Sequence, residues 1–288
     1  MFYLLLAIIS SSLLAIILRF SENKSTSVLG VCLFNYITCA VEGGCFSLLS
    51  SGVNPFSAPL SVMAISIITG IALLVSLILY NVNIANNGTP LAALFSKLGV
   101  IIPILFSFVF FGEKAKLIQL IGILLAIVAI LVINLGGKGE NKSKISKGNF
   151  ITHGTSALVI LLIIGGLCDS MSKIYEYLCP RDFDDAYLFL GFFFAGVITL
   201  ISMIIKRQKI NRYDVIFGIL VGIPNYFVSR FLLKALTSVP SFIVYPSYSV
   251  GTVVLISILS LIIFKEKLNN RQKVGMGLIM VSLVLLNL

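Results

Sequence analysis

The chain alternates long apolar runs with short polar connections along its whole length. A helix that crosses a bilayer needs about 20 mostly apolar residues. By that measure the sequence predicts ten spanning helices, near residues 2–20, 28–48, 60–82, 89–111, 117–135, 156–178, 186–205, 213–234, 240–264 and 271–288. The connections between them are too short to hold a folded soluble domain. We therefore expect any function to reside within the helix bundle.

Composition agrees with a membrane location. The chain is 58% hydrophobic and 11% charged, whereas an average soluble domain carries about a quarter charged residues. Its net charge of +10 would suggest nucleic-acid binding on a soluble chain. Here most basic residues lie in the connections, where they anchor and orient helices. We expect a multi-pass protein of a bacterial inner or plasma membrane. Its expected partner is the lipid bilayer, and we expect no binding of nucleic acid.

The sequence carries no recognisable catalytic or metal-binding motif. Its five cysteines form no CxxC pair and it has a single histidine, His153. GxSxG, HExxH and phosphate-binding loop patterns are missing. We therefore expect no catalytic residues, no metal and no cofactor, and a protein that is not an enzyme. A membrane-embedded enzyme or a scaffold without a cavity is the alternative class.

The two halves of the chain share a pattern. A shift of 153 residues aligns residues 111–135 with 264–288, and the identical pairs include Phe111/Phe264, Glu113/Glu266, Lys114/Lys267, Gln119/Gln272, Gly122/Gly275, Leu125/Leu278, Asn134/Asn287 and Leu135/Leu288. This similarity predicts an internal duplication. We expect a first five-helix repeat at 1–135, a polar linker at 136–155 and a second five-helix repeat at 156–288.

An odd number of helices in each repeat fixes their relative orientation. The second copy would enter the membrane from the opposite side, so the fold class we expect is all-α, with ten transmembrane helices as two inverted five-helix repeats. Many transporters place their substrate site at the interface of such repeats and expose it alternately to each side.

Two short motifs make the chain similar to a known family. Phe-Gly-Glu (111–113) and Phe-Lys-Glu (264–266) each close an apolar run, and each is followed by a Gln-x-x-Gly helix. The chain resembles the drug/metabolite transporter superfamily, in particular its EamA-like members, although Lys265 replaces the usual Gly. The resemblance implies a transporter with a central cavity lined by both halves. We interpret Glu113 and Glu266 as structural turn residues, with ion coupling as the alternative.

Three charged residues lie inside predicted spans, where charge is costly and marks a pathway by default. Lys97 is expected to face an anionic group of the substrate. Glu42, which shares a helix face with Asn35, and Asp169 would meet a substrate amine or carry a proton. The alternative is a set of purely structural buried ion pairs.

Polar and aromatic residues in the second half extend the candidate substrate site. Tyr245 and Tyr248 share one helix face, and Asn225 and Tyr226 follow Pro224. Tyrosine rings can bind a cation, but packing of these rings in the bundle is an equal alternative.

Together these features predict a secondary, non-ATP transporter of a small polar or zwitterionic metabolite, such as an amino acid, working by alternating access. Proton-coupled efflux of organic cations or drugs, including quaternary amines, is the alternative, and Lys97 argues against it. The expected partners are a small-molecule solute and a coupling proton, with a monomer or homodimer as the assembly. Lys and Arg are more frequent in the connections between helices 1–2, 5–6, 7–8 and 9–10 than in those on the opposite side. Since cytoplasmic connections are rich in Lys and Arg, this predicts that both termini lie outside the cell. The family is usually drawn with both termini inside.

Overall fold

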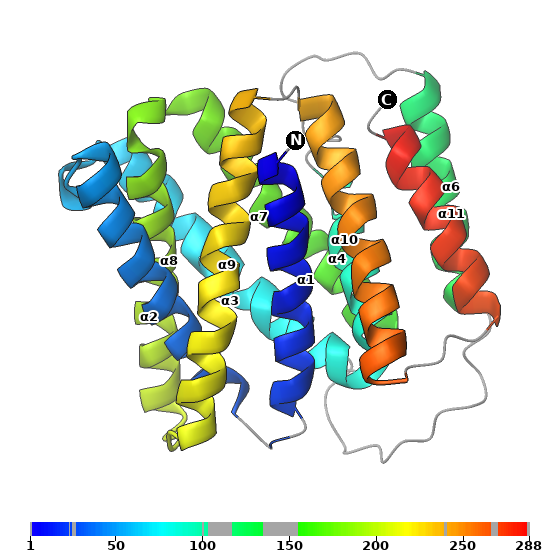
Figure 1. The fold of residues 1–288 in the computed structure, drawn as a ribbon, viewed down its shortest axis with the longest axis horizontal. Coiled ribbons are helices and arrows are strands. Elements are labelled where there is room, and N and C mark those ends of the chain that lie inside the picture. Colours follow the sequence, from blue (N-terminus) through cyan, green and yellow to red (C-terminus); the bar gives the residue numbers. More distant parts are fainter. Residues whose placement is uncertain are drawn as a thin grey trace.

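The computed structural model describes residues 2–22, 24, 27–99, 101–102, 117–134, 155–238, 241–265 and 270–286, and within these ranges it is built from helices without strands. Most of the helices run side by side along one common direction (Figure 1). The expected linker at 136–155, apart from Thr155, and the turn residues Glu113 and Glu266 lie outside the described residues.

The helices fall close to the predicted spans. In the first half they are α1 (Phe2–Glu22), α2 (Val28–Phe46), α3 (Leu60–Asn87), α4 (Thr89–Leu98) and α6 (Leu117–Asn134), with short helical turns η1 (Ser47–Ser51) and η2 (Pro55–Ser57). In the second half they are α7 (Thr155–Leu178), η4 (Arg181–Phe183), α8 (Asp184–Ile205), α9 (Arg212–Ser238), α10 (Ser241–Ile263) and α11 (Asn270–Leu286).

One difference is at the end of α3, which continues beyond residue 82 to Asn87. Another is α4, which ends at Leu98, whereas the predicted span runs from 89 to 111 and lies in part outside the described residues. Helix α3 ends where Gly88 adopts a φ of 84°, a conformation that costs glycine little. Pro90 then lies in the first turn of α4, where its missing N–H has no cost.

Five of the described helices are long and apolar enough to cross a membrane: Phe2–Glu22, Val28–Leu49, Leu60–Asn87, Asp184–Ile205 and Arg212–Ala235. Their outward faces carry large exposed apolar side chains, such as Leu5 and Ile9 on α1 and Ile204 and Ile205 on α8. An apolar exterior of this kind is stable in lipid, where water is absent.

Helices α2 and α9 run in the same direction and pack closely. A Cβ on Gly222 of α9 would lie 2.6 Å from Thr38 Cβ, and one on Gly218 would collide with Phe34. These glycines form a Gly-x-x-x-Gly pattern, which lets two helix backbones approach closely in membranes. This contact brings the polar residues of α2 against those of α9.

The starts of α2 and α9 are joined by one buried carboxylate. Asp214, in the first turn of α9, accepts the Asn211 N–H at 2.9 Å and the Ser27 N–H at 2.8 Å. The first bond closes a capping box on α9. The second reaches the N-cap of α2, and Gly30 leaves room for it, since a Cβ there would lie 2.5 Å from Asp214 Oδ2. The two helices are therefore held in register.

Helices α3 and α8 form a second parallel pair, with Gly70 of α3 against Gly191 and Ala195 of α8. Between the pairs, α2 and α8 run antiparallel, because Gly43 lies beside Phe189 while Tyr36 lies beside Gly196. Tyr36 and Phe192 belong to the main apolar cluster at this contact.

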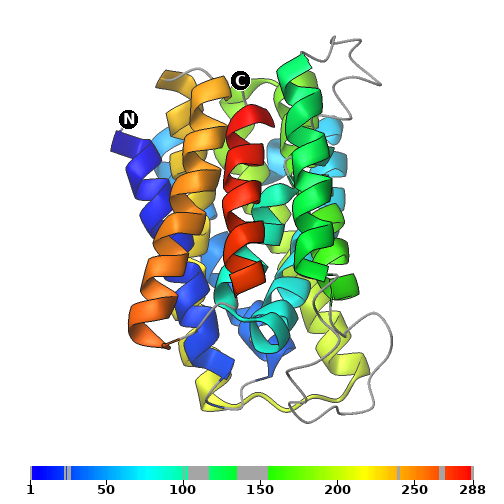
Figure 2. The ribbon, with the colours of Figure 1, turned by 90° about the vertical axis from the view of Figure 1, so that its right-hand side faces the viewer.

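The remaining helices complete the bundle. Helix α10 packs along α1, α4 packs along α7 at Gly99 and Gly166, and α6 pairs with α11 at one side of the bundle (Figures 1 and 2). Ser282 donates a 2.7 Å hydrogen bond to the Gly122 carbonyl in this last pair.

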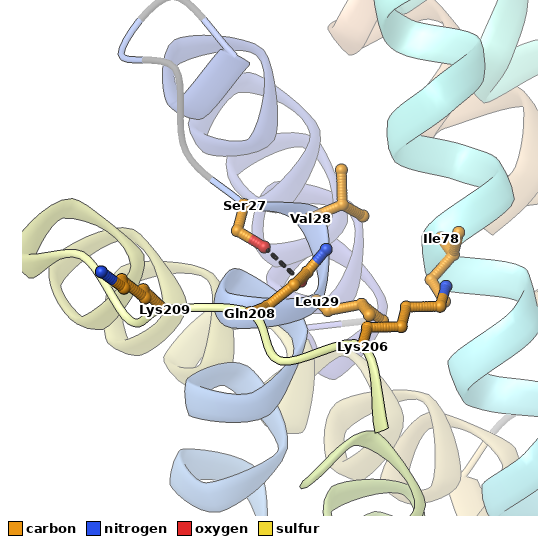
Figure 3. Close-up of a pocket in the computed structure, with 7 residues that line it drawn as sticks. All are labelled: Ser27, Val28, Leu29, Ile78, Lys206, Gln208 and Lys209. Atoms are coloured by element: carbon orange, nitrogen blue, oxygen red, sulfur yellow. Dashed lines mark hydrogen bonds between the residues drawn. The ribbon is translucent and has the colours of Figure 1, made fainter. Parts of the chain in front are cut away.

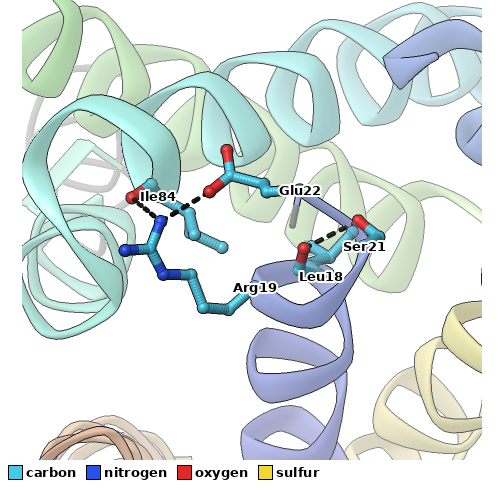
Figure 4. A network of polar contacts seen from close by, with 5 residues as sticks. All are labelled: Leu18, Arg19, Ser21, Glu22 and Ile84. Atoms are coloured by element: carbon cyan, nitrogen blue, oxygen red, sulfur yellow. Dashed lines mark hydrogen bonds and ion pairs between the residues drawn. The ribbon is translucent and has the colours of Figure 1, made fainter. Parts of the chain in front are cut away.

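A polar contact ties the end of α1 to the end of α3. Arg19 pairs with Glu22 at 2.6 Å and donates to the Ile84 carbonyl at 3.4 Å (Figure 4). The arginine therefore donates to a backbone carbonyl near the C-terminal end of α3. A positive charge is favourable at that end of a helix.

Candidate functional site

Lys97 lies in the last turn of α4 and is partly buried. Its Nζ donates a 2.8 Å hydrogen bond to the Tyr248 hydroxyl of α10 and lies 4.0 Å from the centre of the same ring. The ammonium thus interacts with both the oxygen and the π system of one tyrosine. The role in a substrate site that the sequence predicts for Tyr248 stays a prediction, because its ring is in contact with the protein's own lysine.

Asp169, on α7, is an acidic residue within the range of electrostatic interaction with Lys97. Asp169 is nevertheless exposed, whereas Ser170 beside it is buried. Lys97, Tyr248 and Asp169 form a first polar group, which carries one positive and one negative charge. We call it the Lys97 group.

A second polar group lies where α2 meets α9. Asn35 is completely buried, and its Oδ1 accepts a 3.1 Å hydrogen bond from Asn225 Nδ2. Asn35 Nδ2 has no hydrogen-bond partner in the described structure. One turn along α2, the Cys39 thiol donates to the Gly222 carbonyl at 3.3 Å. A buried amide N–H₂ without a partner is costly and calls for an explanation.

Glu42 lies on the same face of α2, near Tyr226 of α9. Its Oε2 is buried and also lacks a partner within the described residues. Phe46, the next turn along, stacks on Tyr226 with ring centres 5.7 Å apart and planes 9° apart. Glu42 therefore lies near a stacked aromatic pair. We call Asn35, Glu42, Asn225 and Tyr226 the Glu42 group.

Two residues that the sequence did not single out as site residues complete this end of the bundle. Arg230 of α9 donates to Tyr226 at 2.8 Å and pairs with Asp185 of α8 at 2.9 Å. Its guanidinium also lies 3.6 Å from the centre of the Phe46 ring. The four-residue spacing of Tyr226 and Arg230 is visible in the sequence. Asp185 has the appearance of an ordinary acid in a first helical turn.

The structure thus divides the expected site into two groups. Within the described residues, no hydrogen bond or ion pair connects the Lys97 group with the Glu42 group. The side chain of Tyr245 lies outside the described part of the chain. Each group joins helices from both halves of the sequence, α4 with α7 and α10 in one and α2 with α9 in the other.

Long apolar helices with outward-facing aliphatic side chains, and polar groups at the contacts between helices, are the features of a multi-pass membrane protein. Residues 155–288 match the model of the EamA-like transporter family. The second half of the chain is therefore similar to that family, which is part of the drug/metabolite transporter superfamily, as its motifs suggested. The family is one of transporters rather than enzymes.

Two proteins are similar to this chain over nearly its whole length. An uncharacterized protein of Haemophilus influenzae is 24% identical over 278 residues, which cover 94% of this chain and 92% of that protein. A solved crystal structure is similar in fold, with a TM-score of 0.62 and 14% identity, and the match covers 99% of this chain and 96% of that one. The helical arrangement is therefore one that a known protein adopts.

Proposed function

We propose that this protein is a secondary transporter of a small polar or zwitterionic metabolite, with amino acids and related compounds as the first candidates. One observation carries the proposal. Charged side chains of both signs lie on helices of the bundle, and two buried polar atoms, Asn35 Nδ2 and Glu42 Oε2, lack hydrogen-bond partners in the described structure. Such atoms are expensive in a bilayer and are retained where a solute or ion pairs with them.

The chemistry of the two groups suits a zwitterion. Lys97 offers a positive charge to a carboxylate or phosphate, while Glu42 and Asp169 offer acceptors to an amine. Asn35, Asn225 and the tyrosine hydroxyls supply neutral hydrogen bonds that can fix orientation. The chain carries no ATP-binding loop, so concentrative transport would draw on a proton or exchange gradient.

We also infer that the ten helices form two inverted five-helix repeats, residues 1–135 and 156–288, joined by a linker. Exchanged contacts support this inference. Thr38 packs on Gly222 and Thr69 on Gly191; likewise Tyr36 packs on Gly196 and Gly43 on Phe189. In each set, the residues that exchange places differ by 153 in number, the same shift that aligns the last helices of the two halves. Reciprocal contacts of this kind are expected of a pseudo-two-fold axis.

Alternating access follows from that architecture, because the two repeats can exchange conformations around a site that both of them line. We place the basic end of the bundle in the cytoplasm of a bacterial cell, by the rule that cytoplasmic connections are rich in Lys and Arg. Helix α1 begins and α11 ends at the opposite end of the bundle (Figure 1), so both termini would be outside. A C-terminal reporter that is active only in the cytoplasm should stay silent, and a bright signal would reverse this orientation.

Proton-coupled efflux of organic cations is the second candidate, and one observation favours it. Glu42 has no cationic partner within the described residues and lies near the stacked rings of Phe46 and Tyr226. An acid beside aromatic faces suits an organic cation. Lys97 argues against such cargo only if Lys97 and Glu42 contact the same solute.

A thermal-shift screen of the purified protein against amino acids, amines and quaternary ammonium compounds, followed by counterflow in liposomes, tests the proposal. A bound solute stabilises the folded state by mass action. A zwitterionic substrate should lose its stabilising effect in both Lys97→Met and Glu42→Gln. An organic cation should lose it only in Glu42→Gln. No stabilisation and no counterflow by any compound would contradict the transporter proposal.

A further inference from the structure

A pocket of about 490 Å³ opens at the basic end of the bundle, where the α8–α9 connection meets the start of α2 (Figure 3). No residue of the Lys97 group or the Glu42 group lines it. Lys206, Gln208 and Lys209 of the α8–α9 connection form its polar side. Its apolar side is formed by Val28 and Leu29, at the start of α2, and by Ile78, in the second half of α3. The cavity therefore combines a basic rim with an apolar floor.

The connection that carries the rim has a defined conformation. Helix α8 ends in paired 3.1 Å bonds, from the Gln208 N–H to the Met203 carbonyl and from the Arg207 N–H to the Ile204 carbonyl. This is the Schellman pattern, which places one residue in the left-handed region. That residue is Arg207, with φ of 47°, where glycine is usual. A non-glycine residue in this conformation is held at a cost by its surroundings.

A side-chain bond fixes the orientation of Gln208. Ser27, the N-cap of α2, donates from its Oγ to Gln208 Oε1 at 2.8 Å (Figure 3). Because the amide oxygen is engaged, the Nε2 group is left to donate, and it makes no hydrogen bond within the described residues. The pocket thus offers an amide donor between two ammonium groups.

The charges around the pocket are predominantly positive. Lys206, Arg207, Lys209 and Arg212 are all exposed. The nearby acid Asp214 is completely buried, and both of its oxygens accept backbone N–H groups. An anion approaching from outside therefore meets lysine and amide donors first.

The pocket adjoins the surface that faces lipid. Ile204 and Ile205, in the last turn of α8 just before Lys206, are 67% and 76% exposed. A free phosphate could use the rim but would gain nothing from Val28, Leu29 and Ile78. A phospholipid could place its phosphate at the rim and its glycerol and first acyl carbons on the floor, since basic pockets between membrane helices bind anionic headgroups.

We propose that this pocket binds the headgroup of an anionic phospholipid, with Lys206, Lys209 and Gln208 Nε2 as the phosphate ligands. The site is independent of the transported solute, so its test leaves the proposed function untouched. The bound lipid would hold the α8–α9 connection against the starts of α2 and α9 when the membrane contains anionic lipid.

Native mass spectrometry of the full-length protein in detergent, titrated with phosphatidylglycerol or phosphatidylcholine, tests this assignment. Each lysine near an anionic surface contributes about 1 kcal/mol, or about a fivefold change in affinity. The double variant Lys206→Gln/Lys209→Gln should therefore bind phosphatidylglycerol about 25-fold more weakly. Gln208→Glu keeps an acceptor for Ser27 but replaces the donor with a negative charge, so it should also bind more weakly.

The matched control is Lys265→Gln/Lys273→Gln, which removes two exposed lysines from the same end of the bundle but outside the pocket. It should bind phosphatidylglycerol within about twofold of the unaltered protein. An equal loss in both double variants would assign the binding to bulk charge and overturn the proposal. Equal binding of phosphatidylcholine, or displacement of phosphatidylglycerol by millimolar inorganic phosphate, would overturn it as well.

Discussion

The ammonium of Lys97 and the hydroxyl of Tyr248 form a 2.8 Å hydrogen bond that joins α4 to α10. Because these helices come from different halves of the chain, the bond crosses the proposed interface between the repeats. Hydrogen bonds to a charged group contribute about 1.5–3 kcal/mol. Replacing Lys97 by Met should lower counterflow of a zwitterionic substrate about tenfold or more.

The matched control for Lys97 is Lys234. It is exposed and also lies over a tyrosine ring, 5.5 Å from the centre of Tyr3. Lys234→Met should therefore leave counterflow unchanged. Unaltered counterflow in Lys97→Met would remove Lys97 from the substrate site.

The second prediction concerns Glu42. Replacing Glu42 by Gln keeps the shape of the side chain and removes the charge, so the variant should fold but lose affinity for a substrate amine. Substrate-induced stabilisation in a thermal-shift assay measures this loss. Glu22→Gln is the control, because Glu22 is bonded to Arg19 near the end of α1. Equal substrate-induced stabilisation of the Glu42→Gln and unaltered proteins would show that the charge on Glu42 has no part in binding.

A third prediction tests the buried ion pair between Asp185 and Arg230, whose side chains are 15% and 7% exposed. Removing one partner of a buried pair leaves an uncompensated charge and costs about 3–5 kcal/mol. Asp185→Asn should therefore lower the melting temperature. The double change Asp185→Asn/Arg230→Gln should recover part of that loss, because neither charge remains buried alone. A double variant less stable than Asp185→Asn would contradict this account of the pair.

The close contact of α2 with α9 gives a fourth prediction. Gly222→Ala would place a Cβ 2.6 Å from Thr38 Cβ and 2.9 Å from the Asn35 carbonyl oxygen. Overpacking of this kind costs about 1–3 kcal/mol. Gly277→Ala is the matched control, since a Cβ there meets nothing within 4 Å. The melting temperature should fall in the first variant and stay the same or rise in the second; the reverse order would mean that α2 and α9 are not packed as described.

The helical elements could be predicted from sequence because bilayer thickness imposes a length on every apolar run. The ends were harder to predict, as α3 shows: apolar content thins after residue 82, but the helix continues until Gly88 provides a conformation that ends it. A backbone stop of this kind depends on one residue rather than on average hydropathy.

The candidate site was predictable only in part. A charge within an apolar run is visible in the sequence, so Lys97, Glu42 and Asp169 could be named. Their division into two groups could not, because it depends on which helices become neighbours. Asp185 was missed as a site residue for the same reason: only in the folded bundle does the start of α8 bring it to Arg230 of α9. Likewise, the Gly-x-x-x-Gly pattern of α9 is visible in the sequence, but the sequence does not show that α2 is the helix packed against it.

Counterflow in proteoliposomes tests the central claim most directly. Liposomes loaded with a zwitterionic compound that stabilises the purified protein should accumulate the labelled compound from outside. Lys97→Met and Glu42→Gln should strongly reduce this accumulation, whereas Lys234→Met should retain it. Accumulation equal to that of protein-free liposomes, for every compound that stabilises the protein, would contradict the assignment of this bundle as a transporter.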